Sequence, residues 1–194
     1  MAKLLVAFIV LLALATPSIA GDPDMLQDIC VADYKSLKGP LRLNGFPCKR
    51  PENVTENDFF FPGLINPGNT GNAVGSLVTA ANVNNLPGLN TLGISISRID
   101  YAPWGLNPPH THPRATEIIF VFVFPRGLVH FQKNIGNSPA VAIAAFNSQL
   151  PGTQSIAETL FDAAAPAVPS DTLARAFQID GRMVEIIKSK FQHK

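Results

Sequence analysis

The chain has 194 residues, with 15 Lys or Arg and 14 Asp or Glu, so its formal net charge is +1 at pH 7. This near-neutral balance excludes the strongly basic surface that is typical of proteins that bind nucleic acid or anionic membranes. A chain of this length is expected to form one domain with accessory segments, because domains usually contain about 100 to 200 residues.

Residues 1–20 have the pattern of a secretory signal peptide. Lys3 gives a positive start, residues 4–15 are almost continuously apolar, and Ser18-Ile19-Ala20 places small residues at the cleavage position. The apolar run is shorter than the roughly 20 residues that a membrane-spanning helix needs. We therefore expect this segment to be removed and the mature chain to be secreted, with a retained anchor as the alternative.

Residues 21–90 are interrupted by Gly, Pro and Asn, so we expect loops and short strands there and no helix longer than two turns. Cys30 and Cys48 are the only cysteines, and in an oxidising compartment they should pair rather than remain as buried thiols. Pairing would stabilise the fold by roughly 3 kcal/mol on the chain-entropy model. Asn53-Val54-Thr55 is a glycosylation sequon in a predicted loop.

Residues 91–150 are predicted to be the core of a β domain. From Leu92 to Ser97, apolar residues alternate with glycine or serine, which is the period of a half-buried strand. Further strands are predicted from Leu128 to Gln132 and from Ala140 to Phe146, the latter with Val141, Ile143 and Ala145 on one side. Turns that contain proline are predicted at Pro87, Pro108-Pro109 and Pro125.

Residues 151–194 are rich in alanine and are predicted to form a short α-helical extension. Ser170 or Asp171, and later Asp180, are candidate helix N-caps. One apolar stripe is expected on each helix, packed either on its own domain or against another subunit; the stripes contain Leu173 and Phe177, then Met183, Ile187 and Phe191.

Three of the chain's four histidines and one glutamate lie between His110 and His130. His110 and His112 are two residues apart, so in a strand they point to the same face and can share an ion. Glu117 would join them only if the chain bends, which the proline after His112 favours. His130 would come from another strand. These four residues are candidate metal ligands; surface histidines with a solvated glutamate are the alternative.

The chemistry of the four candidate ligands narrows the choice of metal. Three imidazoles and one carboxylate, without a thiolate, suit Mn, Fe, Ni, Cu or Zn rather than Ca or a structural zinc site. A six-coordinate ion such as Mn or Fe would keep two positions open for water, a dioxygen species or a small carboxylate. Open positions of this kind would permit catalysis.

Four longer segments carry a specific pattern. They are QDICVAD at 27–33, NGFPC at 44–48, NPPHTHPRATE at 107–117 and PRGLVHFQ at 125–132. Together they resemble the motifs of the plant germin-like proteins, a branch of the cupin superfamily. The resemblance extends over almost the whole chain.

The resemblance implies a mainly β fold, a cupin jelly-roll barrel with a short α-helical C-terminal extension. It further implies a secreted apoplastic glycoprotein that assembles, in the best-known members, as a trimer of dimers. Activities found in the family are superoxide dismutation and oxalate oxidation, some members have no demonstrated catalysis, and the wider superfamily includes seed storage proteins. The residues matching the family's manganese ligands are His110, His112, Glu117 and His130, and its disulfide matches Cys30 and Cys48.

Two small departures from the family pattern concern the first cupin motif and the substrate. Trp104 stands where that motif usually opens with glycine. Asn107 matches an asparagine that faces the substrate in oxalate-oxidising germins, but Ser97 stands where those germins have a second such asparagine. The resemblance therefore implies superoxide dismutation more than oxalate oxidation.

The largest departure follows Glu117, where roughly thirty residues of the family pattern are absent, equivalent to about two barrel strands with their turns. No Gly, Asn or Asp lies between Glu117 and Pro125 to form a turn, so residues 119–124 are expected to run as one strand; a tight hairpin, in which all four ligands could still converge, is the alternative. That strand would lead the chain roughly 20 Å away from the other ligands. It would also leave neighbouring strand edges unpaired unless another chain covers them.

Two functions from different classes follow. The first is a secreted manganese oxidoreductase that dismutates superoxide at the four-ligand site. The second is a non-catalytic extracellular glycoprotein, or a shortened isoform without a working metal site, for which little bound metal is expected.

Overall fold

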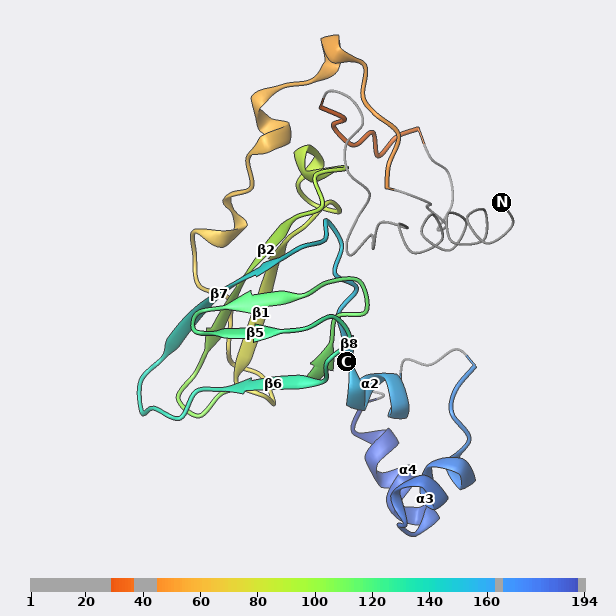
Figure 1. Ribbon diagram of the computed structural model, residues 1–194. Coiled ribbons are helices and arrows are strands. Elements are labelled where there is room, and N and C mark those ends of the chain that lie inside the picture. Colours follow the sequence, from red (N-terminus) through yellow and green to blue (C-terminus); the bar gives the residue numbers. More distant parts are fainter. Residues whose placement is uncertain (1–28, 37–44, 163–165, 192–194) are drawn as a thin grey trace, which may run out of the picture.

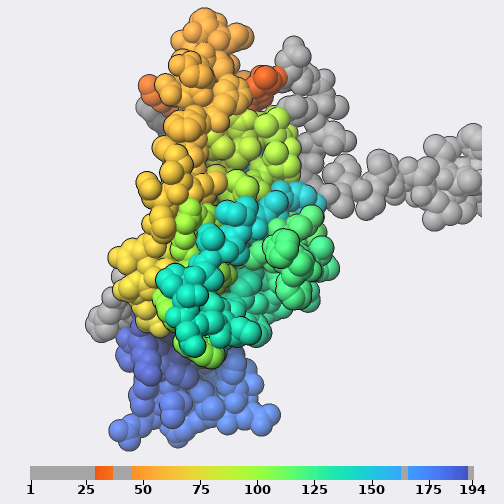
Figure 2. Space-filling model, turned by 90° about the vertical axis from the view of Figure 1, so that its left-hand side faces the viewer, coloured from red at the N-terminus to blue at the C-terminus, as the bar shows by residue number. Residues whose placement is uncertain are grey.

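The computed structural model describes residues 29–36, 45–162 and 166–191. Figure 1 shows strands at the centre, N-terminal loops at one end and the C-terminal helices at the other. The space-filling view shows the same arrangement, with the helices below the strands and residues 45–75 along one side (Figure 2). The predicted signal peptide lies outside the described residues, and among the described helices none is long and apolar enough to cross a membrane.

The described N-terminal loops are held by the expected disulfide between Cys30 and Cys48. Next to it, Ala32 forms a β-bridge with Cys48 and packs with Phe46 and Val83 in a small buried cluster. The described part of this segment contains only short 3-10 helices before its first strand, as the frequent Gly and Pro residues predict. They are η1 Pro51–Asn53, η2 Glu56–Phe59 and η3 Pro62–Leu64, with η4 Pro87–Leu89 after the first strand.

The larger sheet contains five strands in the order β1-β2-β7-β4-β5, and neighbouring strands are antiparallel. The strand predicted at 140–146 is β7 with those bounds, whereas β2 begins three residues later than the predicted alternation. The strands are β1 Ser76–Ala81, β2 Ser95–Tyr101, β4 Glu117–Ile119, β5 Phe122–Phe124 and β7 Ala140–Phe146.

The smaller sheet has the order β6-β3-β8, with β3 Leu106–Thr111, β6 His130–Lys133 and β8 Gln154–Ser155. The prediction of a turn at Pro108-Pro109 was wrong, because both prolines lie inside β3. The register between β3 and β6 shifts between Asn107 and His110. A bulge of this kind leaves residues outside the hydrogen-bond ladder, so prolines, which lack an N–H, are tolerated there.

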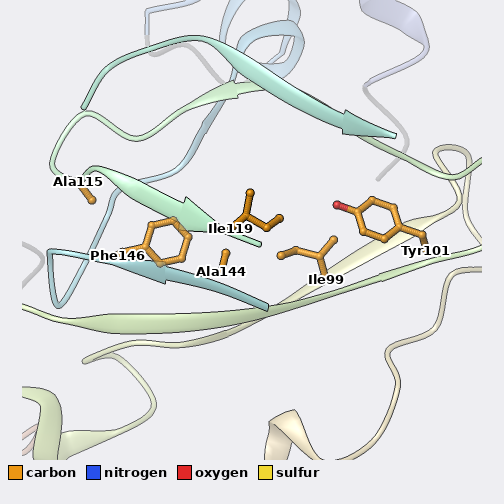
Figure 3. Close-up of a cluster of buried hydrophobic side chains, with 6 residues drawn as sticks. All are labelled: Ile99, Tyr101, Ala115, Ile119, Ala144 and Phe146. Carbon is orange, nitrogen blue, oxygen red and sulfur yellow. The ribbon is translucent and has the colours of Figure 1, made fainter. Parts of the chain in front are cut away.

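The inward face of the larger sheet carries the main core, drawn in Figure 3. At one end of β2 this face is polar, because Ser95 and Ser97 are each 6% exposed while Ile96 faces outward. The Ser95 hydroxyl donates to the carbonyl of Ser148, so its burial does not leave it unpaired. In the predicted alternation of apolar residues and serines, the serines are therefore the residues that are buried. The core consists of Ile99, Tyr101, Ala115, Ile119, Ala144 and Phe146.

Residues 119–124 do not form one strand; the alternative of a tight hairpin is the one that the structure has. Strands β4 and β5 pair as a tight antiparallel hairpin, with Ile119 opposite Phe122 and only Phe120 and Val121 between them. Val121 adopts a φ of +66°, a conformation that glycine or asparagine usually takes in such turns. The hairpin therefore forms at the expense of a strained β-branched residue, and it brings the chain straight back towards Glu117.

The C-terminal extension contains α2 Ile156–Phe161, α3 Ser170–Phe177 and α4 Gly181–Ser189. Asp180 caps α4 as predicted and accepts from the backbone N–H of Arg182. The predicted cap of α3 was wrong, because Pro169 occupies that position and Ser170 begins the helix. Of the stripe predicted on α4, Ile187 and Phe191 are partly buried, but Met183 is exposed and Val184 is the buried residue beside it.

Candidate metal centre

The four candidate ligands come from both sheets and meet in the interior. His110 lies near the end of β3 and directly opposite His130, the first residue of β6. His112 follows β3, and the turn after it leads to Glu117, the first residue of β4. The bend that Pro113 favours is therefore present, and the β4–β5 hairpin keeps Glu117 close to His130 along a short path.

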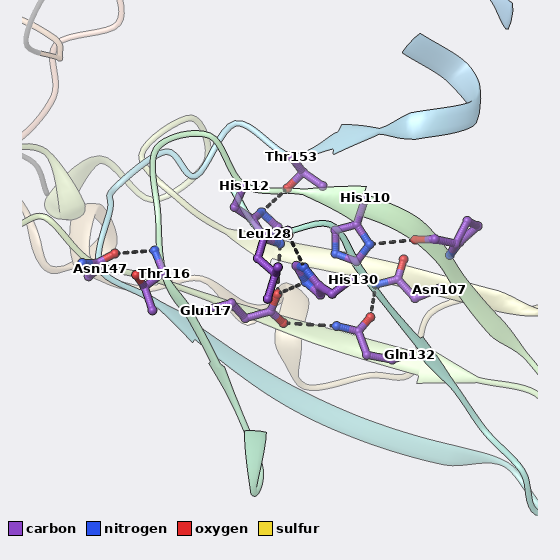
Figure 4. Close-up of polar contacts among 11 residues, drawn as sticks. Asn107, His110, His112, Thr116, Glu117, Leu128, His130, Gln132, Asn147 and Thr153 are labelled. Atoms are coloured by element: carbon purple, nitrogen blue, oxygen red, sulfur yellow. Dashed lines mark hydrogen bonds and ion pairs between the residues drawn. The ribbon is translucent and has the colours of Figure 1, made fainter. Parts of the chain in front are cut away.

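One ligand atom from each residue lies within 4.8 Å of the others, and Figure 4 shows the side chains converging. The Glu117 carboxylate is central, with its Oε2 at 2.8 Å from His130 Nε2 and 3.0 Å from His112 Nε2. The four residues are between 2% and 7% exposed. Four polar groups are thus concentrated in a space that excludes bulk water.

The outer nitrogens of two rings are fixed by the local backbone. His110 Nδ1 lies 2.7 Å from the carbonyl oxygen of Pro108, and His130 Nδ1 lies 2.9 Å from that of Leu128. Because a carbonyl can only accept, each Nδ1 carries the proton, and in a neutral ring Nε2 is then a lone pair. The short contact between His130 Nε2 and Glu117 therefore joins two acceptors unless a proton or a metal ion lies between them.

The surroundings also set the charge on these groups. Burial by itself would raise the pKa of Glu117, but the adjacent His112 and His130 rings hold that pKa below its ordinary value. Burial lowers the pKa of His110, and the other two rings lower it further against the opposing effect of the Pro108 carbonyl. These shifts favour an ionised Glu117 and a neutral His110, and metal binding requires both ligands in these states.

These residues fit a metal ion. The Nε2 of His112 is buried and makes no hydrogen bond of good geometry, although Glu117 is near it. A buried polar nitrogen without a hydrogen bond lowers the stability of the fold unless it has another partner. Three imidazole nitrogens and one carboxylate form a set that divalent first-row transition metals accept. The arrangement can therefore hold such an ion.

Two aromatic rings cover the histidines. Phe146 packs against His112 with ring centroids 4.8 Å apart, and Phe124 stacks on His130 with centroids 4.0 Å apart and planes inclined by 12°. Phe124 belongs to the second strand of the short hairpin, so the segment without turn residues also supplies a wall of the site. Sequence reasoning did not identify either ring as part of the site.

The two residues expected to face the substrate take different positions. Asn107 donates through Nδ2 to Oε1 of Gln132 at 2.7 Å, and Gln132 Nε2 lies 3.5 Å from Oε1 of Glu117. Ser97 is buried on the inward face of β2. Gln132 was missed, although its position two residues after His130 on β6 places it on the same face.

Comparison with known proteins now gives the family. The sequence profile of the Cupin family matches residues 63–122 and 120–185. "Germin-like protein 1-3" from Oryza sativa subsp. japonica is 70% identical, and the match covers 98% of each chain. The chain belongs to the germin-like proteins of the cupin family.

A solved structure and a second relative show how this chain compares with related proteins. The structure of "Recombinant oxalate oxidase in complex with glycolate" has a TM-score of 0.81 and 39% identity, covering 88% of this chain and 98% of that one. "Putative germin-like protein 3-2" from the same rice is 69% identical over 222 positions that include both chains completely, so 28 positions have no counterpart among these 194 residues. The two profile matches overlap at 120–122, which comprises the β4–β5 turn and the first residue of β5.

Proposed function

We propose that this germin-like protein is secreted and holds one manganese ion between His110, His112, Glu117 and His130. The observation that carries the proposal is the buried convergence of the four ligand atoms, with His112 Nε2 lacking a hydrogen bond. The N-terminal signal pattern and the Cys30–Cys48 disulfide support an extracellular location. The manganese assignment rests on resemblance to the family, because the same ligand set suits other transition metals.

The reaction that we propose is superoxide dismutation, in which two superoxide ions and two protons become dioxygen and hydrogen peroxide. A bound manganese ion would supply the one-electron redox chemistry. The chain's own residues would hold the ion and exclude bulk water, since all four ligands are buried. Four protein ligands would leave a six-coordinate ion able to bind small molecules, and the rings of Phe124 and Phe146 limit the space beside His130 and His112.

Oxalate oxidation is the less favoured reaction. The related oxalate oxidase supports the fold and the type of site, but Ser97 offers a shorter side chain than the asparagine expected for that activity. The amide of Asn107 is already engaged by Gln132. An oxalate assay therefore belongs beside the superoxide assay as the test that separates the two reactions.

We further propose that the protein forms a homo-oligomer, a trimer of dimers by resemblance to the family. The outward face of the larger sheet supports association. On this face, residues that pair across four neighbouring strands form a row, and all of them are apolar. Exposed surfaces of this kind often mark contacts between proteins. The row consists of Ile96, Ala145, Ile118 and Val123, with Val141 and Ile143 beside it.

The decisive experiment is elemental analysis of the secreted protein after size-exclusion chromatography. Roughly stoichiometric manganese and superoxide dismutation are expected, and His112→Ala should abolish both because it removes one of the four ligands. Manganese without dismutation would retain the metal site and reject the reaction. A well-folded oligomer that binds no transition metal would instead favour the non-catalytic extracellular glycoprotein.

A further inference from the structure

The three imidazoles of the site are oriented in two different ways. His110 and His130 each direct Nδ1 to the backbone carbonyl of the residue two positions earlier. Because the partner is a backbone carbonyl, this contact does not depend on which side chain the earlier residue carries. His112 has no such carbonyl partner. Its Nδ1 lies 3.1 Å from the hydroxyl oxygen of Thr153, which is 41 residues further along the chain (Figure 4).

The proton on His112 can be placed from its two nitrogens. If Nε2 carried the proton, the acceptor beside it would be Glu117 Oε2 at 3.0 Å, and that contact lacks the geometry of a hydrogen bond. If Nδ1 carries the proton, it donates to the Thr153 hydroxyl and leaves the Nε2 lone pair facing Glu117. The second arrangement gives Nδ1 an acceptor and is the one that binds metal, because a metal ion between Nε2 and the Glu117 carboxylate would relieve the contact of two acceptors.

The segment that carries Thr153 is fixed against the turn that carries His112. Arg114 donates through Nε to the carbonyl of Leu150 at 2.8 Å and through its backbone N–H to the carbonyl of Pro151. Directly after Thr153, strand β8 pairs with β3, and Ser155 then caps α2. Thr153 therefore lies at the junction between the β domain and the C-terminal helices.

We propose that Thr153 is the positioning residue that holds His112 in its metal-binding tautomer. It does so from the junction with the C-terminal extension. Partners of this kind, which accept from the outer nitrogen of a ligating histidine, typically change metal affinity 10- to 100-fold when removed. The inference rests on the proposed metal site, but the tautomer of His112 can be measured without any metal.

The test compares Thr153→Val with wild type in the full secreted chain. Valine keeps the shape of threonine but places a methyl group where the hydroxyl was, so Nδ1 loses this acceptor. We expect roughly a 10-fold or greater rise in the manganese dissociation constant, measured by chelator competition. In the metal-free protein, nitrogen NMR shifts of His112 should change from an Nδ1-protonated ring to a mixture of tautomers.

Two further variants separate positioning from packing. Thr153→Ser keeps the hydroxyl and should restore the wild-type affinity and tautomer. Thr111→Val makes the same chemical change next to the site, at a hydroxyl that is buried without a hydrogen bond, and should leave both readouts unchanged. An unaltered tautomer and affinity in Thr153→Val, or an equal loss in Thr111→Val, would overturn the inference. Wild-type protein that binds no metal would reject the proposed function, while the tautomer comparison would still decide the role of Thr153.

Discussion

The ring of Phe124 lies almost parallel to that of His130, with the two centroids 4.0 Å apart. Phe124 also packs against the main core while remaining half-buried. Replacing it with alanine should lower the free energy of unfolding by about 2 kcal/mol, the value of a buried side chain of this size. It should also accelerate removal of bound metal by a chelator, because water gains access to His130. Denaturant unfolding and the rate of metal release measure the two effects.

Phe122 provides the matched comparison for Phe124. It stacks on Phe124 with ring planes inclined by 4°, but it is 60% exposed and does not contact the histidines. Phe122→Ala should therefore cost less than about 1 kcal/mol and leave metal release unchanged. Equal effects of the two variants on metal release would show that Phe124 contributes only general stability.

The turn between β4 and β5 gives the second prediction. A β-branched residue at φ +66° costs about 1 to 2 kcal/mol relative to glycine, and the side chain of Val121 is 76% exposed. Val121→Gly should therefore raise the free energy of unfolding by about 1 kcal/mol. Val123→Gly, in the neighbouring strand at an ordinary φ, should lower it by about the same amount. A loss of stability in Val121→Gly would mean that the hairpin does not have this turn.

The ligand set illustrates what local sequence pattern can predict here. Two-residue spacing places His110 and His112 on one face, and Pro113 indicates the bend that returns the chain to Glu117. These features depend only on strand periodicity and on the local conformation of proline. The direction of burial on β2 does not, because it depends on a contact with a distant residue, the donation from the Ser95 hydroxyl to the Ser148 carbonyl.

Other features depend on contacts between distant segments, which a single sequence does not reveal. The β4–β5 hairpin forms without any favourable turn residue because it allows Ile119 to pack in the core and Phe124 to stack on His130. Thr153 meets His112 only because β8 joins the edge of β3. In both cases tertiary packing outweighs the local preferences from which the sequence predictions were made.

Asn53 gives a prediction about modification. It ends η1, its side chain is exposed, and it begins the sequon Asn53-Val54-Thr55. Protein secreted from a eukaryotic host should therefore carry one N-linked glycan, seen as a mobility shift after enzymatic deglycosylation. Asn53→Gln should abolish the shift, whereas Thr55→Ser keeps the sequon and should retain it. An unshifted wild-type band would contradict the prediction.

The pair of Arg98 and Asp100 on β2 gives a prediction about pH. Arg98 donates to both oxygens of Asp100, at 2.9 to 3.0 Å, and also to the carbonyls of Leu64 and Ile65. Asp100 in turn accepts from the backbone N–H of Gly68. The pair therefore attaches the N-terminal loops to the sheet. The hydrogen bonds from Arg98 hold the pKa of Asp100 below its ordinary value of 3.8, against the opposing effect of burial.

Because the pKa of Asp100 is lower in the folded protein, the unfolded chain takes up a proton first as the pH falls. The stability that this carboxylate contributes is thus fully present well above pH 3.8 and is lost as the pH falls from that value through the folded pKa. Asp100→Asn should cost about 3 kcal/mol at neutral pH, because Arg98 loses its charged partner, and much less at low pH. Unfolding measured across this range, with the exposed Asp171→Asn as control, tests the difference. A penalty for Asp100→Asn that stays constant down to low pH would show that the ion pair does not stabilise the fold.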